Sequence, residues 1–263
     1  MKYALVTGAA GGMGRSTVSA LLQQDYQVFA LDKKCGEPAD HLTWLQTDIT
    51  DEASVAAAFE AVRSQTERLD AVVHFTGIYM LDSLVEMTPE AFEAIFRVNL
   101  YGAFLINRTF LPLLKPGSRV LMTTSELAPL DPLPFTGIYG ITKSALDKYA
   151  YSLRMELQLL KIHISVLRAG AVNTGMLGVS TDALDRFCRQ TRLYSCNAKR
   201  FKAIVDRVEA RNISTEKLAA KVAKILGKKK PKFNYAINRN PLLRLLNILP
   251  KRMQLWIIKT ILK

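Results

Sequence analysis

Short apolar runs of strand length alternate with segments of helical periodicity over the first two thirds of this 263-residue chain. The runs are almost continuously apolar, which is typical of strands that are buried on both faces. Such strands pair in parallel when a helix joins each to the next, because a parallel crossover needs a connection of that length. The pattern therefore predicts an α/β fold with a doubly wound parallel sheet and helices on both faces.

The alternation also predicts the bounds of the elements. Strands are expected at residues 3–7, 27–31, 43–46, 71–75, 119–123 and 163–168, with a short strand-like run at 233–237. Helices are expected at residues 12–24, 52–65, 89–114, 138–160 and 215–226, and two short amphipathic helices at 241–249 and 250–262. Thr88 and Ser214 each supply a side-chain oxygen that can cap the helix that follows.

Nothing in the sequence predicts export. The cysteines, Cys35, Cys188 and Cys196, are an odd number without metal-ligand spacing, which is typical of a reducing compartment. The apolar run after Lys2 is too short for a signal peptide, and no run reaches the ~18 apolar residues that span a bilayer. We expect a cytoplasmic protein without a metal site.

A glycine-rich turn joins the first expected strand to the first expected helix. It runs from Thr7 to Gly14 as TGAAGGMG. Glycines allow a tight turn and bring backbone amides against a pyrophosphate, which a helix N-terminus also favours. The placement predicts a Rossmann-type dinucleotide site formed by Thr7, Gly8, Gly12, Met13 and Gly14.

Asp32 ends the second expected strand, eighteen residues after Gly14. A carboxylate there accepts hydrogen bonds from the adenosine ribose and repels a 2′-phosphate, which favours NAD over NADP. Lys33 and Lys34 follow directly and could neutralise such a phosphate, so NADP stays the alternative cofactor. A turn aspartate without a ligand is the other interpretation of Asp32.

Tyr139 and Lys143 lie one helical turn apart in the expected helix at 138–160, so both side chains project from one face. A tyrosine is a poor base at neutral pH because its ordinary pKa is near 10. A cation within a few ångströms stabilises the phenolate and brings the group toward useful proton transfer. The pair alone occurs by chance in many helices.

Two further polar residues accompany this pair. Ser125 follows the fifth expected strand, fourteen residues before Tyr139, and Asn99 lies within the expected helix at 89–114. With these residues in order, the chain resembles the short-chain dehydrogenase/reductase family, in particular its hydroxysteroid- and retinol-dehydrogenase-like members. The resemblance rests on T-G-x-x-x-G-x-G, an Asn, a Ser and Y-x-x-x-K, and it covers almost the whole chain.

The resemblance implies a role for each residue of the set. Tyr139 would exchange a proton with the substrate oxygen, and Ser125 would hydrogen-bond to that oxygen. Lys143 would contact the nicotinamide ribose and lower the pKa of Tyr139, and Asn99 would order a water that links Lys143 to solvent. The cofactor would carry the hydride, so the implied reaction interconverts a secondary alcohol and a ketone.

The resemblance also implies further cofactor contacts. Asp48 and Ile49 match the positions at the adenine ring, Gly77 matches the turn after the fourth strand, and Val172 and Thr174 match the nicotinamide side.

The chain departs from the family pattern at two positions. His74 stands where the family usually has Asn, and Ala169 precedes Gly170 where the family usually has Pro. His74 could make the structural hydrogen bond of that Asn or merely fill space.

Residues 176–212 occupy the stretch that covers the substrate in this fold. They mix apolar with basic side chains: Met176, Leu177, Val179, Leu184, Phe187, Leu193, Tyr194, Phe201, Arg186, Arg189, Arg192, Lys199 and Arg200. An apolar lid with basic residues favours a hydrophobic alcohol or ketone such as a hydroxysteroid, a bile acid or a fatty derivative. A helix with a core-facing stripe and a solvated basic face fits equally well.

Two other functions stay open. One is the oxidation or reduction of a small polar or sugar-derived substrate by the same residues. The other is a catalytically silent NAD-binding sensor, against which the complete set of Asn99, Ser125, Tyr139 and Lys143 argues.

Positive charge gathers at the end of the chain. Residues 199–263 hold 18 Lys and Arg against 3 Asp and Glu, whereas the first 198 residues hold 18 against 20. We expect a catalytic domain over residues 1–227 and a basic amphipathic extension over 228–263. The extension could pack on its own domain and shield the substrate opening, join a second subunit, or make peripheral membrane contact.

Two expectations concern macromolecular partners. The basic stretch lacks the interleaved aromatic residues and the helix-turn-helix of nucleic-acid binders, so no nucleic acid is expected. A homodimer or homotetramer is expected through the helices at 89–114 and 138–160, since relatives pair through the corresponding helices.

Overall fold

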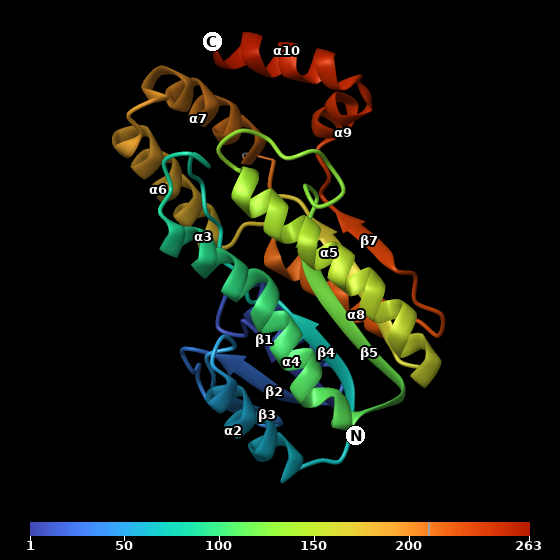
Figure 1. Cartoon of the computed structure of the whole chain (residues 1–263). Helices are drawn as coiled ribbons and strands as arrows, with labels where there is room; N and C mark the ends of the chain where they lie inside the picture. Colours follow the sequence, from blue (N-terminus) through green and yellow to red (C-terminus); the bar gives the residue numbers. More distant parts are fainter. Residues whose placement is uncertain (210) are drawn as a thin grey trace.

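The computed structural model describes residues 1–209 and 211–263, without the side chains of residues 175–182, 208 and 209. Within these residues, seven parallel strands form one sheet in the order β3-β2-β1-β4-β5-β6-β7 (Figure 1). The strands are β1 Lys2–Thr7, β2 Tyr26–Asp32, β3 Leu42–Gln46, β4 Leu69–His74, β5 Leu114–Ser125, β6 His163–Ala169 and β7 Asn234–Ile237. The expected doubly wound parallel sheet is confirmed.

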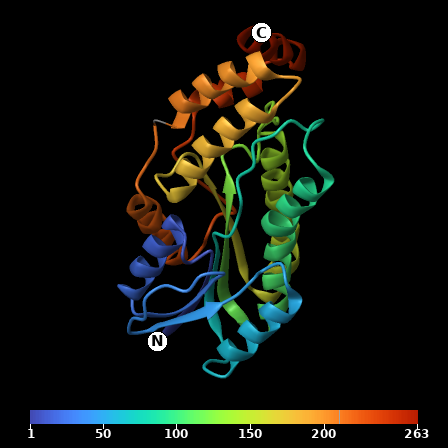
Figure 2. The ribbon, with the colours of Figure 1, turned by 90° about the vertical axis from the view of Figure 1, so that its left-hand side faces the viewer.

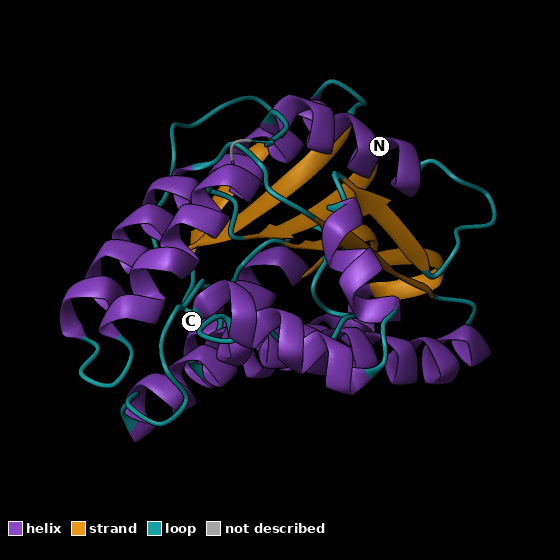
Figure 3. Cartoon of the chain, turned by 90° about the horizontal axis from the view of Figure 1, so that it is seen from above, coloured by secondary structure: helices purple, strands orange, loops and turns teal. Residues whose placement is uncertain are grey.

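Helices cover both faces of this sheet (Figure 3). One face carries α1 (Gly12–Leu22) and α8 (Thr215–Leu226), and the other carries α2 (Glu52–Arg63), α4 (Gly102–Phe110) and α5 (Gly137–Leu157). Side chains of β1 alternate between the layers, because Leu5 packs with the α2 side whereas Ala4 and Val6 pack with the α1 side. Burial on both faces explains why the strands are continuously apolar.

The remaining helices lie toward the carboxyl ends of the strands. They are α3 (Pro89–Phe96), α6 (Gly175–Gln190), α7 (Ser195–Glu209), α9 (Pro241–Ile248) and α10 (Lys251–Leu262). Figure 2 shows α6, α7 and the C-terminal helices standing above the sheet. No helix in the described part of the chain is long and apolar enough to cross a membrane.

Helix starts follow the capping residues. Thr88 Oγ1 accepts from the Ala91 amide, and Ser214 Oγ accepts from the Lys217 amide, so α3 and α8 begin where the sequence predicts. The extension expected after residue 227 contributes β7 to the edge of the sheet before α9 and α10. The domain division itself stays a prediction.

The single helix expected at 89–114 is wrong. A π-helical turn, Arg97–Tyr101, separates α3 from α4, and a 3-10 turn, Leu111–Leu113, follows α4. Pro112 lacks an amide hydrogen, which is why the regular helix ends at Phe110. β5 then begins at Leu114, earlier than expected, where it pairs with Leu69 of β4.

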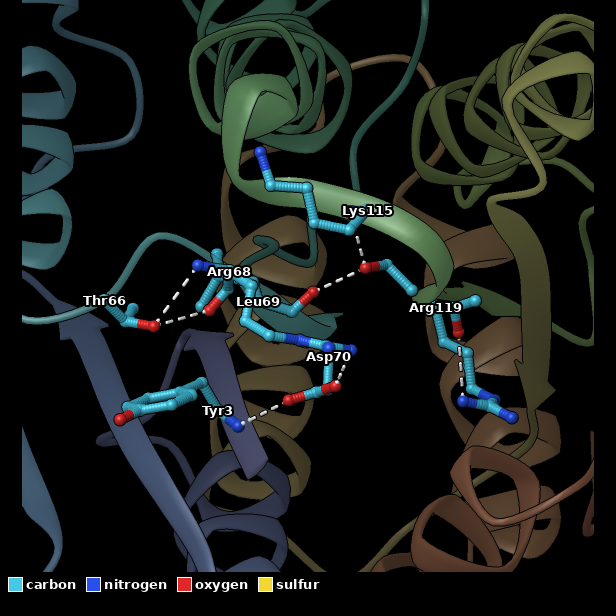
Figure 4. A network of polar contacts seen from close by, with 9 residues as sticks. Tyr3, Thr66, Arg68, Leu69, Asp70, Lys115 and Arg119 are labelled. Carbon is cyan, nitrogen blue, oxygen red and sulfur yellow. Dashed lines mark hydrogen bonds and ion pairs between the residues drawn. The ribbon is translucent and has the colours of Figure 1, made fainter. Parts of the chain in front are cut away.

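Polar contacts join the amino ends of β1, β4 and β5 (Figure 4). The Tyr3 amide donates to Asp70 Oδ2 at 2.9 Å, and Arg68 forms an ion pair with the same carboxylate. Ser118 Oγ donates to the Leu69 carbonyl oxygen at 2.6 Å. These contacts hold the strands in register at the end of the sheet that lies away from the glycine-rich turn.

Asp147 of α5 and Arg168 of β6 form an ion pair at 2.6 Å with both side chains largely buried. Thr124 Oγ1 of β5 donates to the same carboxylate, so the pair joins α5 to two strands. Each charge of a buried ion pair is stabilised mainly by its partner, because neither charge is hydrated by water.

Arg168→Ala should therefore lower the free energy of unfolding by about 3–5 kcal/mol, since it leaves the Asp147 carboxylate buried without its cation. Urea unfolding monitored by circular dichroism measures the change. Arg63→Ala is the matched control, because the Glu60–Arg63 pair is exposed and is worth about 0–1 kcal/mol. Equal losses in the two variants would contradict this account of the pair.

Candidate active site

The glycine-rich turn forms a backbone cradle between β1 and α1. Gly8 has a φ of +69°, and a Cβ there would lie 2.6 Å from the Thr76 amide nitrogen. A Cβ at Gly14 would lie 2.1 Å from the Gly8 carbonyl oxygen. Only glycine permits these approaches, and α1 begins beside them at Gly12, where the first amides of a helix lack intrahelical partners. The residues present fit a pyrophosphate at a helix N-terminus.

This cradle opens into a cleft of about 570 Å³ beside β1 and β4, where the strand order of the sheet reverses. Most residues expected to contact the cofactor line it: Gly8, Gly12, Met13, Gly14, Asp32, Asp48, Ile49, Gly77 and Thr174. Thr7 does not line it, because its side chain is buried in β1. Val172 lines the neighbouring cavity instead.

Asp32 lies at the edge of the cleft and also binds the glycine-rich turn. Its Oδ2 accepts from the Ala10 amide at 3.0 Å, and its Oδ1 accepts from the Lys34 amide at 3.3 Å. Lys33 forms an ion pair with Asp48 at 2.8 Å. Burial acts to raise the pKa of Asp48, but hydrogen bonds from Lys33 and Thr50 outweigh it and lower the pKa to about 2.

Tyr139, Lys143 and Ser125 meet at the carboxyl ends of the strands. Tyr139 and Lys143 project from the first turns of α5, and Ser125 is the last residue of β5. Burial raises the pKa of Tyr139 to about 12, and a hydrogen bond with Ser125 acts in the opposite direction. Burial lowers the pKa of Lys143 to about 8. The lowered tyrosine pKa implied by the resemblance is not what the structure shows.

The Lys143 side chain is buried beside β5 and the turn after β4. Its Nζ donates to the Thr123 carbonyl oxygen at 3.4 Å and lies 5.8 Å from the centre of the Tyr139 ring. A Cβ at Gly77 would lie 3.0 Å from this Nζ, so the turn after β4 approaches the ammonium closely. The described residues provide no carboxylate partner for it.

Asn99 lies in the π-helical turn and holds two segments together. Its Oδ1 accepts from the Ile78 amide at 2.8 Å, and its Nδ2 donates to the Ile78 carbonyl oxygen at 3.0 Å. The same Nδ2 donates to Thr142 Oγ1 of α5 at 3.1 Å. Asn99 thus joins the turn after β4 to the helix that carries Tyr139 and Lys143.

A second cavity, of about 220 Å³, adjoins the cleft. Ser125, Tyr139 and Lys143 line it, and it shares Met13, Phe75, Gly77, Tyr79 and Thr174 with the cleft. The rest of its wall is mainly apolar: Leu127, Leu133, Val172, Phe201, Ile204, Val205 and Leu243. The catalytic side chains expected from sequence therefore lie where a cofactor cleft meets an apolar cavity.

The expected lid forms only part of this wall. Leu184, Phe187 and Phe201 pack in one cluster with Phe135. Of these three lid residues, Phe201 alone also lines the cavity. Leu193 is exposed at the turn between α6 and α7. The side chains of Met176, Leu177 and Val179 lie outside the described residues. The basic residues of the lid, Arg186, Arg189, Arg192, Lys199 and Arg200, are exposed to solvent.

Sequence reasoning missed two features of the cavity wall. Leu243 comes from the C-terminal extension, and only the three-dimensional fold brings it into the wall of the cavity that Tyr139 also lines. Ile204 and Val205 continue the apolar stripe of α7, which helical periodicity could have found. Glu126 was not missed in the same way, because its position directly after Ser125 indicates the mouth of the site. It lines the cavity and accepts from the Asn240 amide. Burial raises the pKa of this carboxyl, although the amide opposes it.

His74, the first departure from the family pattern, has a structural position. Its Nε2 lies 3.0 Å from Asn107 Oδ1, and Asn107 Nδ2 donates to the Tyr149 hydroxyl. The ring thus joins β4 to α4 and α5. Burial lowers the pKa of His74 to about 4, although the Asn107 contact opposes the shift, so the imidazole is neutral at physiological pH.

The described part of the chain shows neither a disulfide nor a metal-binding cluster. The three cysteines are free thiols. The described residues contain no cluster of three or more His, Cys, Asp or Glu side chains that could hold a metal ion.

Comparisons with known proteins agree with this geometry. The chain is 25% identical to a 3-ketodihydrosphingosine reductase of Bacteroides thetaiotaomicron over 243 residues, which are 92% of this chain and 89% of that protein. It is 30% identical to estradiol 17-beta-dehydrogenase 2 of Mus musculus over 200 residues, 70% of this chain and 51% of that protein.

Solved structures share the fold. A 3-ketoacyl-(acyl-carrier-protein) reductase from Brucella melitensis complexed with NADH superposes with a TM-score of 0.73 at 23% identity, over 90% of this chain and 96% of that chain. A short chain dehydrogenase from Burkholderia cenocepacia in complex with NADP superposes with a TM-score of 0.73 at 20% identity, over all of both chains.

The first of these two structures is complexed with NADH and the second is in complex with NADP. Residues 2–185 match the family model for short chain dehydrogenases. The matched residues include strands β1 to β6 and the four residues Asn99, Ser125, Tyr139 and Lys143. The chain belongs to the short chain dehydrogenase family of oxidoreductases.

Proposed function

We propose that this protein interconverts a secondary alcohol and a ketone with NAD(H), and that its substrate is a hydrophobic, lipid-like alcohol or ketone such as a hydroxysteroid. The observation that carries the proposal is the position of Ser125 and Tyr139 in the wall of an apolar cavity that is continuous with the glycine-rich cleft. A substrate oxygen at that wall would be next to the nicotinamide side of the cleft.

Each residue of the set has a distinct part in this proposal. The bound cofactor supplies or accepts the hydride. Tyr139 gives a proton to the carbonyl oxygen during reduction, and Ser125 holds the same oxygen by a hydrogen bond. Asn99 positions the turn at Ile78 and the start of α5, which keeps Lys143 beside Tyr139.

The protonation states favour the reductive direction. With a pKa of about 12, Tyr139 carries its proton at neutral pH and is ready to act as the acid. Lys143, with a pKa of about 8, is mainly charged at neutral pH and stabilises the phenolate that remains after transfer. The two groups act as one proton-transfer unit.

NAD is the proposed cofactor because of the charges at the adenosine end of the cleft. Asp32 places a carboxylate there, and hydrogen bonds from two backbone amides hold it. Lys33, which could otherwise attract a 2′-phosphate, is engaged with Asp48. Lys34 is the remaining nearby cation, and only its backbone amide contacts Asp32.

Several features support a lipid-like substrate. Leu127, Leu133, Ile204, Val205 and Leu243 give the cavity an apolar wall, which suits an alicyclic or acyl body better than a sugar. Two of the relatives are named for lipid substrates, a 3-ketodihydrosphingosine reductase and an estradiol 17-beta-dehydrogenase.

Assembly into a homodimer or homotetramer remains a prediction. An apolar groove of about 750 Å³ on α3 and α4, lined by Phe92, Phe96, Leu100 and Phe104, supports it. The groove also includes Tyr149 of α5, so it lies on the helices expected to pair.

Tyr139→Phe should lower turnover by about a hundredfold to ten-thousandfold while leaving NADH binding near normal, because it removes the transferable proton and little else. Nicotinamide absorbance measures turnover, and NADH fluorescence titration measures binding. Tyr151→Phe, on the exposed face of the same helix, is the matched control and should match the parent protein. Retained turnover in Tyr139→Phe would exclude this residue as the proton donor.

Asp32→Asn should raise the ratio of kcat/KM for NADP to that for NAD by at least about tenfold, because it removes the repelling charge and keeps the hydrogen-bond acceptor for Ala10. Initial rates with each cofactor measure the ratio. Asp40→Asn changes the charge by the same amount at an exposed position and should leave the ratio unchanged. An unchanged ratio in Asp32→Asn would remove Asp32 as the selector.

A further inference from the structure

The outer faces of α9 and α10 expose an unusual concentration of large apolar side chains. Seven of the eighteen large apolar residues that the described part of the chain exposes lie on these two helices: Leu242, Leu245, Ile248, Met253, Leu255, Trp256 and Ile261. Leu255 and Trp256 are 68% and 66% exposed. Apolar surface gathered in this way marks an interaction site.

The two helices are nevertheless fixed to the body of the protein. Gln254 and Leu262 are buried on the inner side of α10, and Lys251 forms an ion pair with Asp131. Asn197 Nδ2 of α7 donates to the Leu262 carbonyl oxygen at 2.6 Å. The helices therefore present a rigid outer face, which Figure 1 shows at the end of the molecule beyond α5 and α7.

Positive charge accompanies this apolar face. Residues 241–263 contain five cations, Arg244, Lys251, Arg252, Lys259 and Lys263, and no acidic residue. Among the described residues, only Lys251 of these five has an ion-pair partner. Apolar side chains interspersed with Lys and Arg, with a Trp among them, are typical of helices that lie in an anionic headgroup layer.

The apolar face also continues toward the substrate cavity. Leu243, on the inner side of α9, lines the cavity that contains Tyr139. A groove of about 440 Å³ runs between α10 and the loop of Leu84 and Val85, with Lys259 and Lys263 in its lining. Leu84 and Val85 are themselves exposed, so the apolar surface extends beyond the two helices.

We propose that α9 and α10 dock this protein on an anionic lipid surface, with Leu255 and Trp256 at the acyl boundary and Arg252 and Lys259 among the headgroups. Because Leu243 belongs to the same docked element, docking places the substrate cavity beside the lipid layer. The access of a lipid substrate from that layer rests on the proposed function, whereas the docking itself does not.

A second copy of the chain fits this face less well than a membrane does. A two-fold symmetric contact brings the same patch of each subunit together. The four cations without an ion-pair partner among the described residues would then face the same four across an apolar contact, and like charges at an interface are costly. An anionic surface instead neutralises them, each Lys or Arg adding to the attraction.

The fluorescence of Trp256 reports docking directly. The chain has two tryptophans, so Trp44→Phe leaves Trp256 as the single emitter. Vesicles of phosphatidylcholine and phosphatidylglycerol should shift its emission to shorter wavelength, and vesicles of phosphatidylcholine alone should leave it nearly unchanged. No shift with the anionic vesicles would overturn the proposal.

A matched pair of charge reversals tests the electrostatic part by vesicle co-sedimentation. Arg252→Glu with Lys259→Glu should weaken binding to the anionic vesicles by at least about tenfold. Lys229→Glu with Lys230→Glu makes the same change of charge just before β7, at the other end of the sheet, and should weaken binding by no more than about twofold. Equal losses in the two variants would show non-specific attraction and overturn a dedicated docking face.

The double variant Leu255→Gln with Trp256→Gln tests whether the apolar side chains contribute to lipid binding. It also tests whether a second copy of the chain, rather than a membrane, covers this face. Vesicle binding should fall, while the melting temperature and the turnover of a water-soluble ketone stay near those of the parent protein. Analytical ultracentrifugation of the same variant detects subunit contact. If the variant dissociates an oligomer and vesicle binding is unchanged, the face is a subunit interface and the proposal is wrong.

The vesicle-binding and fluorescence measurements need neither cofactor nor substrate, and the melting temperature alone shows that each variant is folded. A failure to bind vesicles therefore leaves the proposed oxidoreductase activity untouched, and an absence of turnover leaves the docking proposal untouched.

Discussion

The burial of the Lys143 ammonium is the constraint on which the rest of the site depends. A cation removed from water loses its hydration, which is why its pKa falls to about 8. The polar atom that receives it is the Thr123 carbonyl oxygen of β5, at 3.4 Å. The turn after β4 approaches the ammonium closely, because a Cβ at Gly77 would lie 3.0 Å from it. β5, α5 and the turn after β4 thus all meet at this one charge.

Asn99 shows how a local departure from regular structure serves this arrangement. Helical periodicity predicts a continuous α-helix at 89–114, and only the family resemblance distinguishes Asn99 from its other polar residues. The π-helical turn at Arg97–Tyr101 places the Asn99 amide where it bonds both Ile78 and Thr142. Single π-helical turns cost backbone geometry and occur often at functional sites. Apolar periodicity does not report them, so the sequence could not predict this one.

The sequence predicts well those features that depend on interactions between residues close together in the chain. The apolar strands, the capped helix starts and the glycine-rich turn depend on neighbouring residues, and the structure has the sheet and these helix starts where they were expected. The Tyr139–Lys143 spacing places both side chains on one face of α5 for the same reason. The wall of the substrate cavity combines distant segments, such as α5 with Tyr139 and α9 with Leu243. The sequence leaves packing of the extension at the substrate opening as one of several alternatives, and it could not identify Leu243 as the residue in the wall. The direction of the Tyr139 pKa shift was also missed, because burial outweighs its favourable contacts.

The most direct test of the account is the pH dependence of ketone reduction with saturating NADH and a hydrophobic ketone, over about pH 6 to 10. The account predicts steady turnover at neutral pH and a fall as the pH rises through about 8, where Lys143 loses its charge while Tyr139 keeps its proton. Turnover that stays constant or rises through that range would contradict the claim that the buried cation supports proton transfer by Tyr139.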